Sequence, residues 1–238
     1  MPQISIIIPA LNEAESIAHV VSELPWSIIA ECIVVDNGST DATAALADAA
    51  GARVIQSPRG YGAACLAGSK AALSTSDILV YMDGDGSDII GNLARLTTPI
   101  ANDEADFVIG SRIKGDREPG SMLPSQVFAG QMVGFLLRLL QGVRYTDMGP
   151  FRAIRRSSLE AMQMQELTYG WNLEMQIKAA QHNLRIREIT VGYRARFGGT
   201  SKVSGDWKAS VKAATRIMEV LFRVGLKKRH RNADWRAQ

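Results

Sequence analysis

The chain has 238 residues, of which 46% are hydrophobic and 21% charged, and its formal net charge is +3. This length can bury a sizeable core, so we expect one large α/β domain or a domain with a small appendage. No apolar run reaches the roughly 18–20 residues that span a bilayer, and Met1 leads directly into a strand pattern. We therefore predict neither a transmembrane helix nor a signal peptide. Cys32 and Cys65 show no metal-ligand spacing and no disulfide framework, which favours a cytoplasmic location.

The positive charge is concentrated at the end of the chain. Residues 227–238 contain five basic residues and one acidic residue, a net charge of +4, so residues 1–226 carry about −1. This distribution argues against a nucleic-acid-binding protein and indicates a local contact with anions. We predict a single domain over 1–226 and a basic tail over 227–238 that places the protein peripherally at the cytoplasmic face of a membrane. For the basic last helix we expect packing on the sheet with a solvated basic side, and the alternative is contact with an anionic membrane.

Strand and helix patterns alternate over the first 112 residues. The predicted strands cover about 4–9, 31–36, 53–56, 77–83 and 106–110, and helical patterns cover about 14–24, 41–50, 61–74 and 89–102. This alternation predicts parallel strands joined by crossover helices. Asp41 is placed to cap the second helix, which Gly51 closes.

The pattern changes after about residue 112. A loop is followed by a helix at about 122–141 with an apolar stripe, and then by a polar turn. A strand at 151–154, a helix at about 171–182, a strand at 185–191, a glycine-bounded loop and a helix at about 207–224 complete the chain. We interpret 1–112 as a nucleotide-type half and 113–226 as a substrate half on the same sheet.

Polar and acidic residues follow three of the predicted strands. These segments are Pro9-Ala10-Leu11-Asn12-Glu13, Asp36-Asn37-Gly38 and Asp83-Gly84-Asp85-Gly86-Ser87-Asp88. Ligands of open α/β sheets bind outside the carboxyl ends of the strands, so these segments predict one shared cleft. Asp83 and Asp85 can share one cation, and their hard oxygens suit Mg²⁺ or Mn²⁺ that bridges to phosphates. The alternative is an acidic turn that caps a helix, with Ser87 or Asp88 as N-cap.

Eight short motifs occur in order along the chain. They are Ile8-Pro9-Ala10-Leu11-Asn12-Glu13, Val35-Asp36-Asn37-Gly38-Ser39-Thr40-Asp41, Arg59-Gly60-Tyr61-Gly62, Asp83-Gly84-Asp85, Gly110-Ser111-Arg112, Thr146-Asp147-Met148-Gly149-Pro150-Phe151-Arg152-Ala153, Asn172-Leu173-Glu174 and Gly199-Thr200-Ser201-Lys202. Together they resemble the family 2 glycosyltransferases of GT-A fold, in the branch of dolichyl- or polyprenyl-phosphate sugar synthases. The resemblance covers about residues 4–205.

The resemblance implies an α/β fold with a GT-A-type mixed, mostly parallel sheet flanked by helices. It implies an inverting transfer of a hexose, for which we expect glucose from UDP-glucose, to a polyprenyl or dolichyl phosphate, with Mg²⁺ or Mn²⁺ as cofactor. On the donor side Asp36 would hold the base, Asp83 and Asp85 the metal and diphosphate, and further residues would line the donor. These further residues are Pro9, Leu11, Glu13, Gly60 and Gly84.

Four residues are candidates for acceptor and phosphate contacts. A phosphate acceptor, with a second pKa of roughly 6, needs positioning, whereas a hydroxyl acceptor needs a base, and Asp147 suits either. The guanidinium groups of Arg112 and Arg152 suit a phosphate, and Lys202 lies in a loop that would close over the diphosphate. The structural alternatives are a turn residue for Asp147, surface ion pairs for the arginines and a solvated loop lysine.

Two departures from the branch leave parts of the site open. Ser87 stands where the branch usually has a Gln, so the third metal ligand is undetermined, and Gly149-Pro150-Phe151-Arg152 replaces the usual Ser-Gly-Phe-Arg. A soluble enzyme with a small phosphorylated or hydroxyl acceptor is therefore an alternative. A nucleotidyltransferase would need a basic glycine-rich loop where Pro9–Glu13 stands, and the intact carboxylate pair argues against an inactive binding module. The sugar, the base and any homo-oligomer are left undetermined by the sequence.

Overall fold

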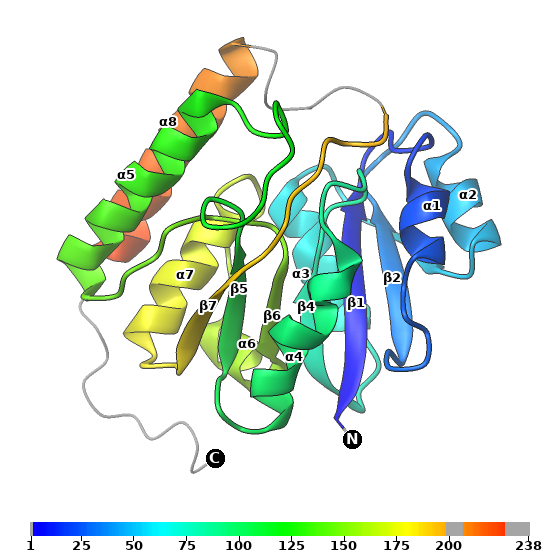
Figure 1. Cartoon of the computed structure of the whole chain (residues 1–238), viewed down its shortest axis with the longest axis horizontal. Helices are drawn as coiled ribbons and strands as arrows, with labels where there is room; N and C mark the ends of the chain where they lie inside the picture. The colour runs from blue at the N-terminus through cyan, green and yellow to red at the C-terminus, as the bar shows by residue number, and fades with distance from the viewer. Residues whose placement is uncertain (1, 199–206, 227–238) are drawn as a thin grey trace.

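The computed structural model describes residues 2–198 and 207–226, and the side chains of all of these except 207–214. Figure 1 shows a central sheet with helices on both faces. The strands are β1 (Gln3–Ala10), β2 (Glu31–Asp36), β3 (Arg53–Gln56), β4 (Ser76–Tyr81), β5 (Phe107–Ser111), β6 (Arg152–Arg155) and β7 (Ile186–Thr190). The helices are α1 (Ile17–Ser22), α2 (Thr43–Ala49), α3 (Tyr61–Ala71), the 3₁₀ turn η1 (Ile90–Asn92), α4 (Leu93–Ala101), α5 (Pro124–Gln141), α6 (Arg156–Met162), α7 (Trp171–Gln181) and α8 (Trp207–Gly225).

The strands form one mixed sheet in the order β3-β2-β1-β4-β6-β5-β7. Strand β6 is antiparallel to both of its neighbours, β4 and β5, and all other pairs are parallel. The predicted mixed, mostly parallel sheet flanked by helices is therefore confirmed. Because β1, β2 and β4 are parallel neighbours, the polar segments that follow them meet at one edge of the sheet.

Two hydrophobic layers hold the helices against the sheet. Side chains of a strand alternate between its faces, so Ile6 and Ile8 of β1 pack with α1, α2 and α4, whereas Ile7 packs on the opposite face. That opposite layer contains α3, α6 and α7, together with the inner sides of α5 and α8. Trp171 is among its largest fully buried side chains.

The prediction differs from the structure mainly at helix starts. The helix expected from residue 14 begins at Ile17, because the preceding turn is pinned to the segment after β2. The Asn12 amide N–H donates to Ser39 Oγ, and the Glu13 N–H donates to Thr43 Oγ1. The helix expected over 89–102 divides into η1 and α4, and helix α6 was not predicted.

Helix α5 is the long helix expected near 122–141, and α8 packs against α7 and α5. Two side-chain amides bind the end of α8: Gln141 Nε2 donates to the Gly225 carbonyl and Gln181 Nε2 to the Val224 carbonyl. None of the helices within 2–198 and 207–226 is both long and apolar enough to cross a membrane.

Candidate active site

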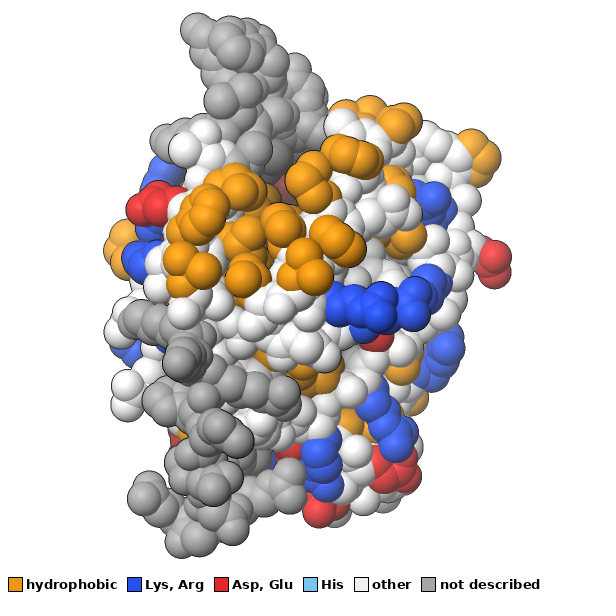
Figure 2. All heavy atoms as spheres, turned by 90° about the vertical axis from the view of Figure 1, so that its left-hand side faces the viewer, with side chains coloured by type: hydrophobic (Ala, Val, Ile, Leu, Met, Phe, Trp, Pro, Cys, Tyr) orange, Lys and Arg blue, Asp and Glu red, His pale blue; other side chains and the backbone are white. Residues whose placement is uncertain are grey.

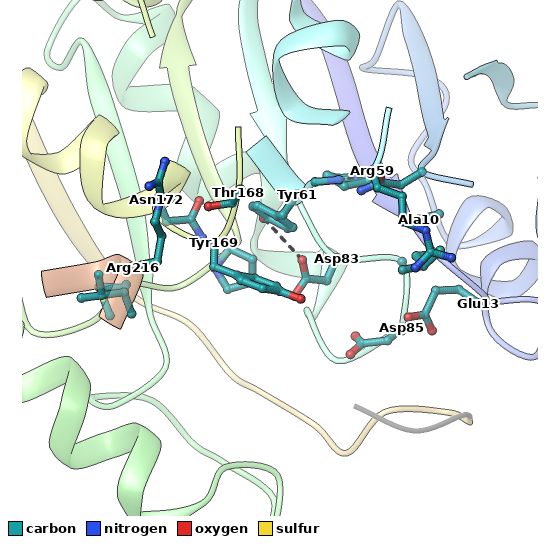
Figure 3. Close-up of a pocket in the computed structure, with 18 of the residues that line it drawn as sticks. Ala10, Glu13, Arg59, Tyr61, Asp83, Asp85, Thr168, Tyr169, Asn172 and Arg216 are labelled. Atoms are coloured by element: carbon teal, nitrogen blue, oxygen red, sulfur yellow. Dashed lines mark hydrogen bonds between the residues drawn. The ribbon is translucent and has the colours of Figure 1, made fainter. Parts of the chain in front are cut away.

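A cavity of about 1150 Å³ opens at the carboxyl ends of β1 and β4 (Figure 3). Its donor-side wall comes from the segments after these strands and from the start of α3. Its far wall comes from residues 168–172 and from α8. The predicted residues that line it are Pro9, Leu11, Glu13, Gly60, Asp83, Gly84, Asp85 and Arg112. The structure thus brings together residues up to about 100 positions apart in the sequence.

Asp83 and Asp85 place two carboxylates in this cavity. The Tyr61 hydroxyl donates to Asp83 Oδ1 at 3.5 Å, and Asp85 Oδ1 accepts bonds from the backbone N–H and the hydroxyl of Ser87. Burial and the negative charges of Asp85 and Asp88 raise the pKa of Asp83 well above its ordinary value. The carboxylates therefore crowd one another without enough positive charge, and a cation would relieve their repulsion.

Asp88 extends this acidic cluster beneath the cavity. Its Oδ2 accepts the Asp83 N–H at 3.0 Å, whereas its buried Oδ1 has no hydrogen-bond partner. Burial raises the pKa of Asp88 to about 7. The alternative of a helix cap at Ser87 or Asp88 is wrong, because the next helical turn, η1, begins at Ile90 with Ile89 as its N-cap.

The carboxylates of Asp83 and Asp85 fit a divalent ion that also binds substrate phosphates. No group of three His, Cys, Asp or Glu side chains with metal-binding geometry occurs in the part of the chain that the structure describes. Asp83 and Asp85 alone suit Mg²⁺ or Mn²⁺, because such ions usually take one or two protein carboxylates and complete their coordination with phosphate oxygens and water. The Ser87 hydroxyl donates a hydrogen bond to Asp85 Oδ1, so Ser87 supports this carboxylate and does not take its place as a metal ligand.

Arg196 was not predicted, and it lies between two of the predicted residues. Its Nη2 is 3.0 Å from Glu13 Oε2 and 3.7 Å from Asp85 Oδ2. Arg196 lies in the irregular segment after β7, and nothing in its sequence environment indicated that this segment returns to the end of β1. It brings a positive charge to the carboxylate side of the cavity.

Asp36 lies at the end of β2 opposite Ala10 of β1, and it is buried. Its Oδ1 accepts the Ser39 N–H at 3.0 Å and its Oδ2 accepts from Gln56 Nε2 at 2.9 Å. Burial raises the pKa of Asp36, but these hydrogen bonds outweigh burial and hold it below its ordinary value. Asp36 is therefore an ionised acceptor behind the cavity, whose wall here is formed by the next residue, Asn37.

Gly60 and Gly62 allow a close approach of two backbone segments. A Cβ on Gly60 would lie 2.2 Å from the Leu167 carbonyl oxygen, and one on Gly62 would lie 2.2 Å from the Glu166 carbonyl oxygen. Gly60 also has a φ of 139°, and its N–H donates to Asn37 Oδ1. These glycines thus hold the start of α3 against the far wall, and the Gly60 N–H has a protein partner rather than being open to an anion.

Arg112 reaches the cavity and is held there by Asp147. Its Nε donates to Asp147 Oδ2 at 2.8 Å and its Nη2 to Asp147 Oδ1 at 2.9 Å, while its guanidinium lies 4.9 Å from the centre of the Tyr193 ring. Burial raises the pKa of Asp147, but the bonds from Arg112 outweigh it and the pKa is lowered. Asp147 does not line the cavity and its side chain is 2% exposed, so the expectation that it faces the acceptor is not met. It orients Arg112 instead.

Arg152 does not form the expected phosphate-binding pair with Arg112. Its side chain is 0% exposed, its Nε and Nη2 donate to the Gly149 carbonyl, and its Nη1 donates to the Asn172 carbonyl. The cause is its place in β6, in the middle of the sheet, where an inward side chain points into the core. Arg152 therefore ties the 149–150 turn to the start of α7 and lies outside the cavity.

The far wall of the cavity contains a second ion-pair cluster that the sequence did not reveal. The fully buried Glu166 accepts hydrogen bonds from Thr168, Arg216 and Arg223. Arg216 also pairs with Glu219 at 2.7 Å, and both of these α8 residues line the cavity. Figure 3 shows Arg216 on the opposite side of the cavity from Glu13. Lys202 and the basic tail lie outside the described residues.

Comparison with known proteins places this arrangement in a class. The fold matches solved structures of glucosyl-3-phosphoglycerate synthase from Mycobacterium tuberculosis, at 22% identity. One, described as a complex with Mn²⁺, UDP-glucose and phosphoglyceric acid, has a TM-score of 0.75 and covers 95% of this chain and 81% of that chain. The fold is therefore that of the GT-A glycosyltransferases.

The chain belongs to glycosyl transferase family 2, whose sequence model matches residues 5–162. An uncharacterized glycosyltransferase of Mycobacterium tuberculosis is 36% identical over 220 residues, covering 92% of this chain and 97% of the relative. The undecaprenyl-phosphate mannosyltransferase of Micrococcus luteus is 31% identical over 219 residues, covering 84% and 86%. The polyprenol monophosphomannose synthase of Mycolicibacterium smegmatis is 30% identical over 237 residues, covering 92% and 84%. These relatives confirm the predicted family and branch.

Proposed function

We propose that this glycosyltransferase moves a hexose from a UDP-sugar to a polyprenyl phosphate with inversion at the anomeric carbon. The observation that carries the proposal is the pair Asp83 and Asp85 at the carboxyl end of β4, which faces a cavity whose walls also hold arginines. Relatives whose names include undecaprenyl phosphate and polyprenol support the acceptor class. Solved neighbours described with UDP-glucose suggest the donor to be tested first.

In this proposal Asp83 and Asp85 would hold the Mg²⁺ or Mn²⁺, and the ion would supply positive charge to stabilise the leaving diphosphate. Asp36 lies behind the cavity wall at Asn37, and it would accept the imide N–H of the base once the base displaces that wall. Arg196 moves from Asp85 to the diphosphate, because a phosphate oxygen offers the same charge-assisted hydrogen bonds that Glu13 now provides. These roles are assigned by position and charge.

Arg112 positions the attacking phosphate in this proposal. A phosphate monoester near pH 7 already carries the nucleophilic oxygen, so the step needs no general base. The phosphate oxygen forms a bond to the anomeric carbon while the bond from that carbon to the diphosphate oxygen breaks, and UDP leaves with the electron pair. Asp147 contributes by fixing the guanidinium of Arg112, and Arg152 by fixing the 149–150 turn.

A soluble phosphorylated acceptor is the second candidate, because a guanidinium binds the phosphate group itself and solved neighbours are described with phosphoglyceric acid. The test is a transfer screen with Mn²⁺ over UDP- and GDP-linked hexoses. Each donor is offered polyprenyl phosphate in vesicles, phosphoglycerate or no acceptor, with a parallel series in EDTA. We expect lipid-linked hexose from a UDP-sugar, and no product in EDTA. Product from phosphoglycerate alone would select the second candidate, and full turnover in EDTA would remove the metal from the proposal.

A further inference from the structure

Exposed apolar side chains are concentrated on one face of the molecule. Nine of the large hydrophobic residues that are exposed in the described part of the chain lie on α5 and α8 or directly beside them. They are Leu123, Phe128, Met132, Phe135, Leu139, Leu140, Met218, Phe222 and Leu226. Figure 2 shows hydrophobic side chains gathered into one patch on this side of the molecule. Contiguous patches of this kind mark interaction sites. We call these nine residues the α5/α8 face.

The α5 part of this face follows directly from helix geometry. Phe128, Met132, Phe135 and Leu139 recur at intervals of four, three and four residues, so they share one side of the helix. Phe128 is 63% exposed, Phe135 is 60% exposed and Leu139 is 67% exposed. The opposite side of α5 is buried and includes Gly134, where a Cβ would lie 2.1 Å from the Tyr145 carbonyl oxygen. The helix is therefore fixed to the domain by one side and presents aromatic and leucine side chains on the other.

The charges around the face select its partner. Helix α5 contains no acidic residue, and Arg138, the only charged residue in it, is exposed. Arg223 of α8 is exposed as well, although it also pairs with the buried Glu166, and the sequence after Leu226 continues with Lys227-Lys228-Arg229. In Figure 2, Lys and Arg side chains lie along one edge of the patch. Two copies of this face would bring like charges together, whereas an anionic lipid surface would neutralise them.

We propose that the α5/α8 face binds the surface of an anionic bilayer. Its aromatic and leucine side chains enter the boundary between headgroups and acyl chains, and the surrounding arginines contact lipid phosphates. This docking requires no membrane-spanning segment. An apolar patch with few charges gives limited affinity, so the binding is reversible. Salt screens the attraction between the basic side chains and the lipid phosphates, so the binding weakens with increasing salt.

The same helix connects this face to the cavity. Thr215, Arg216, Ile217 and Glu219 of α8 line the cavity, whereas Met218 and Phe222 belong to the α5/α8 face. A docked molecule would therefore hold one wall of its cavity next to the lipid headgroups. The value of this position for sugar transfer rests on the proposed lipid-phosphate acceptor, whereas the docking of the α5/α8 face on a membrane does not.

The test is co-sedimentation of the full chain with vesicles of neutral phosphatidylcholine, or of phosphatidylcholine mixed with phosphatidylglycerol, without substrate. The variant is Phe135→Asp with Leu139→Asp, and the control is Ile28→Asp, which alters a residue that is 46% exposed in the loop between α1 and β2. We expect the parent and the control to bind the anionic vesicles, and the double variant to bind them at least tenfold more weakly. Failure of the parent to bind anionic vesicles would overturn the proposal.

Two further measurements distinguish membrane docking from a folding defect and from self-association. Circular dichroism and donor hydrolysis with Mn²⁺ verify that the double variant is folded, because its substitutions lie outside the cavity. Light scattering gives the oligomeric state: a parent dimer that the double variant dissociates, with no vesicle binding by either, would assign the face to a second copy and overturn the proposal. Vesicle binding by a parent that transfers sugar to no lipid phosphate would reject the proposed acceptor and leave the docking intact.

Discussion

Replacing Asp147 by asparagine tests whether the bond between Asp147 and Arg112 organises the acceptor side. The carboxylate accepts the Arg112 backbone N–H, both sides of the Arg112 guanidinium fork and the Met148 N–H. An asparagine keeps the shape but sets an amide N–H₂ group against one guanidinium donor. Removing one partner of a buried ion pair typically destabilises a protein by roughly 3–5 kcal/mol. The Arg112 side chain is 16% exposed and can gain water, so we expect a loss of about 2–4 kcal/mol.

The assay is urea unfolding of the parent and the variant between pH 3 and pH 8. The pKa of Asp147 is lowered in the folded protein, so its contribution is complete above the unfolded pKa of about 3.9. The contribution is lost as the pH falls through the lower folded value. The difference in stability between parent and Asp147→Asn should therefore be constant from pH 8 to about pH 5, and decrease toward pH 3. The matched control is Asp103→Asn, whose carboxylate is exposed and pairs with arginines at the surface, and it should have a much smaller effect. Equal stability of the Asp147 variant and the parent at pH 7 would refute the buried pair.

Three other substitutions test the rest of the site. Asp85→Ala should abolish transfer while circular dichroism remains that of the parent, and normal turnover in the variant would remove Asp85 from the metal site. Asp36→Ala should weaken UDP binding by about 1–3 kcal/mol in calorimetry, the range for an unpaired buried partner, and unchanged affinity would exclude a base contact. Gly62→Ala should lower the free energy of unfolding by about 1–3 kcal/mol, because its Cβ would meet the Glu166 carbonyl at 2.2 Å. Gly91→Ala, with no atom within 4 Å of its Cβ, is the control, and equal effects of the two substitutions would contradict a packing origin.

The carboxylate side of the cavity could be predicted from the sequence because it depends on strand order. Parallel strands place their carboxyl ends at one edge, so the acidic residues after β1, β2 and β4 had to meet once the β-α alternation was recognised. The spacing of Asp83 and Asp85 after a buried strand left a helix cap as an alternative, and the polar segments after the two neighbouring strands favoured the shared cleft.

The rest of the cavity could not be predicted in the same way, because it depends on contacts between segments without regular periodicity. Arg196 follows the last strand in an irregular segment, and only the folded chain shows that it reaches Glu13. Arg152 has the residue type of a phosphate ligand, but its place in the central strand β6 turns it into the core. A motif fixes the residue type, whereas the direction of the side chain depends on the strand and its neighbours.

The ion pairs of Glu166 affect which parts of the cavity can change in sequence among relatives. One carboxylate, through Arg216 and Arg223, attaches a helix that follows the sheet in sequence and forms one wall of the cavity. The parallel strands β1, β2 and β4, which lead into the carboxylate side of the cavity, lie in the first half of the chain. Helix α8 comes after the last strand of the sheet. Exchange of α8 between relatives, with Arg216 and Arg223 retained as partners of Glu166, would therefore change the far wall of the cavity and leave Asp83 and Asp85 in place. The two opposite walls of the cavity are thus separable parts of one polypeptide.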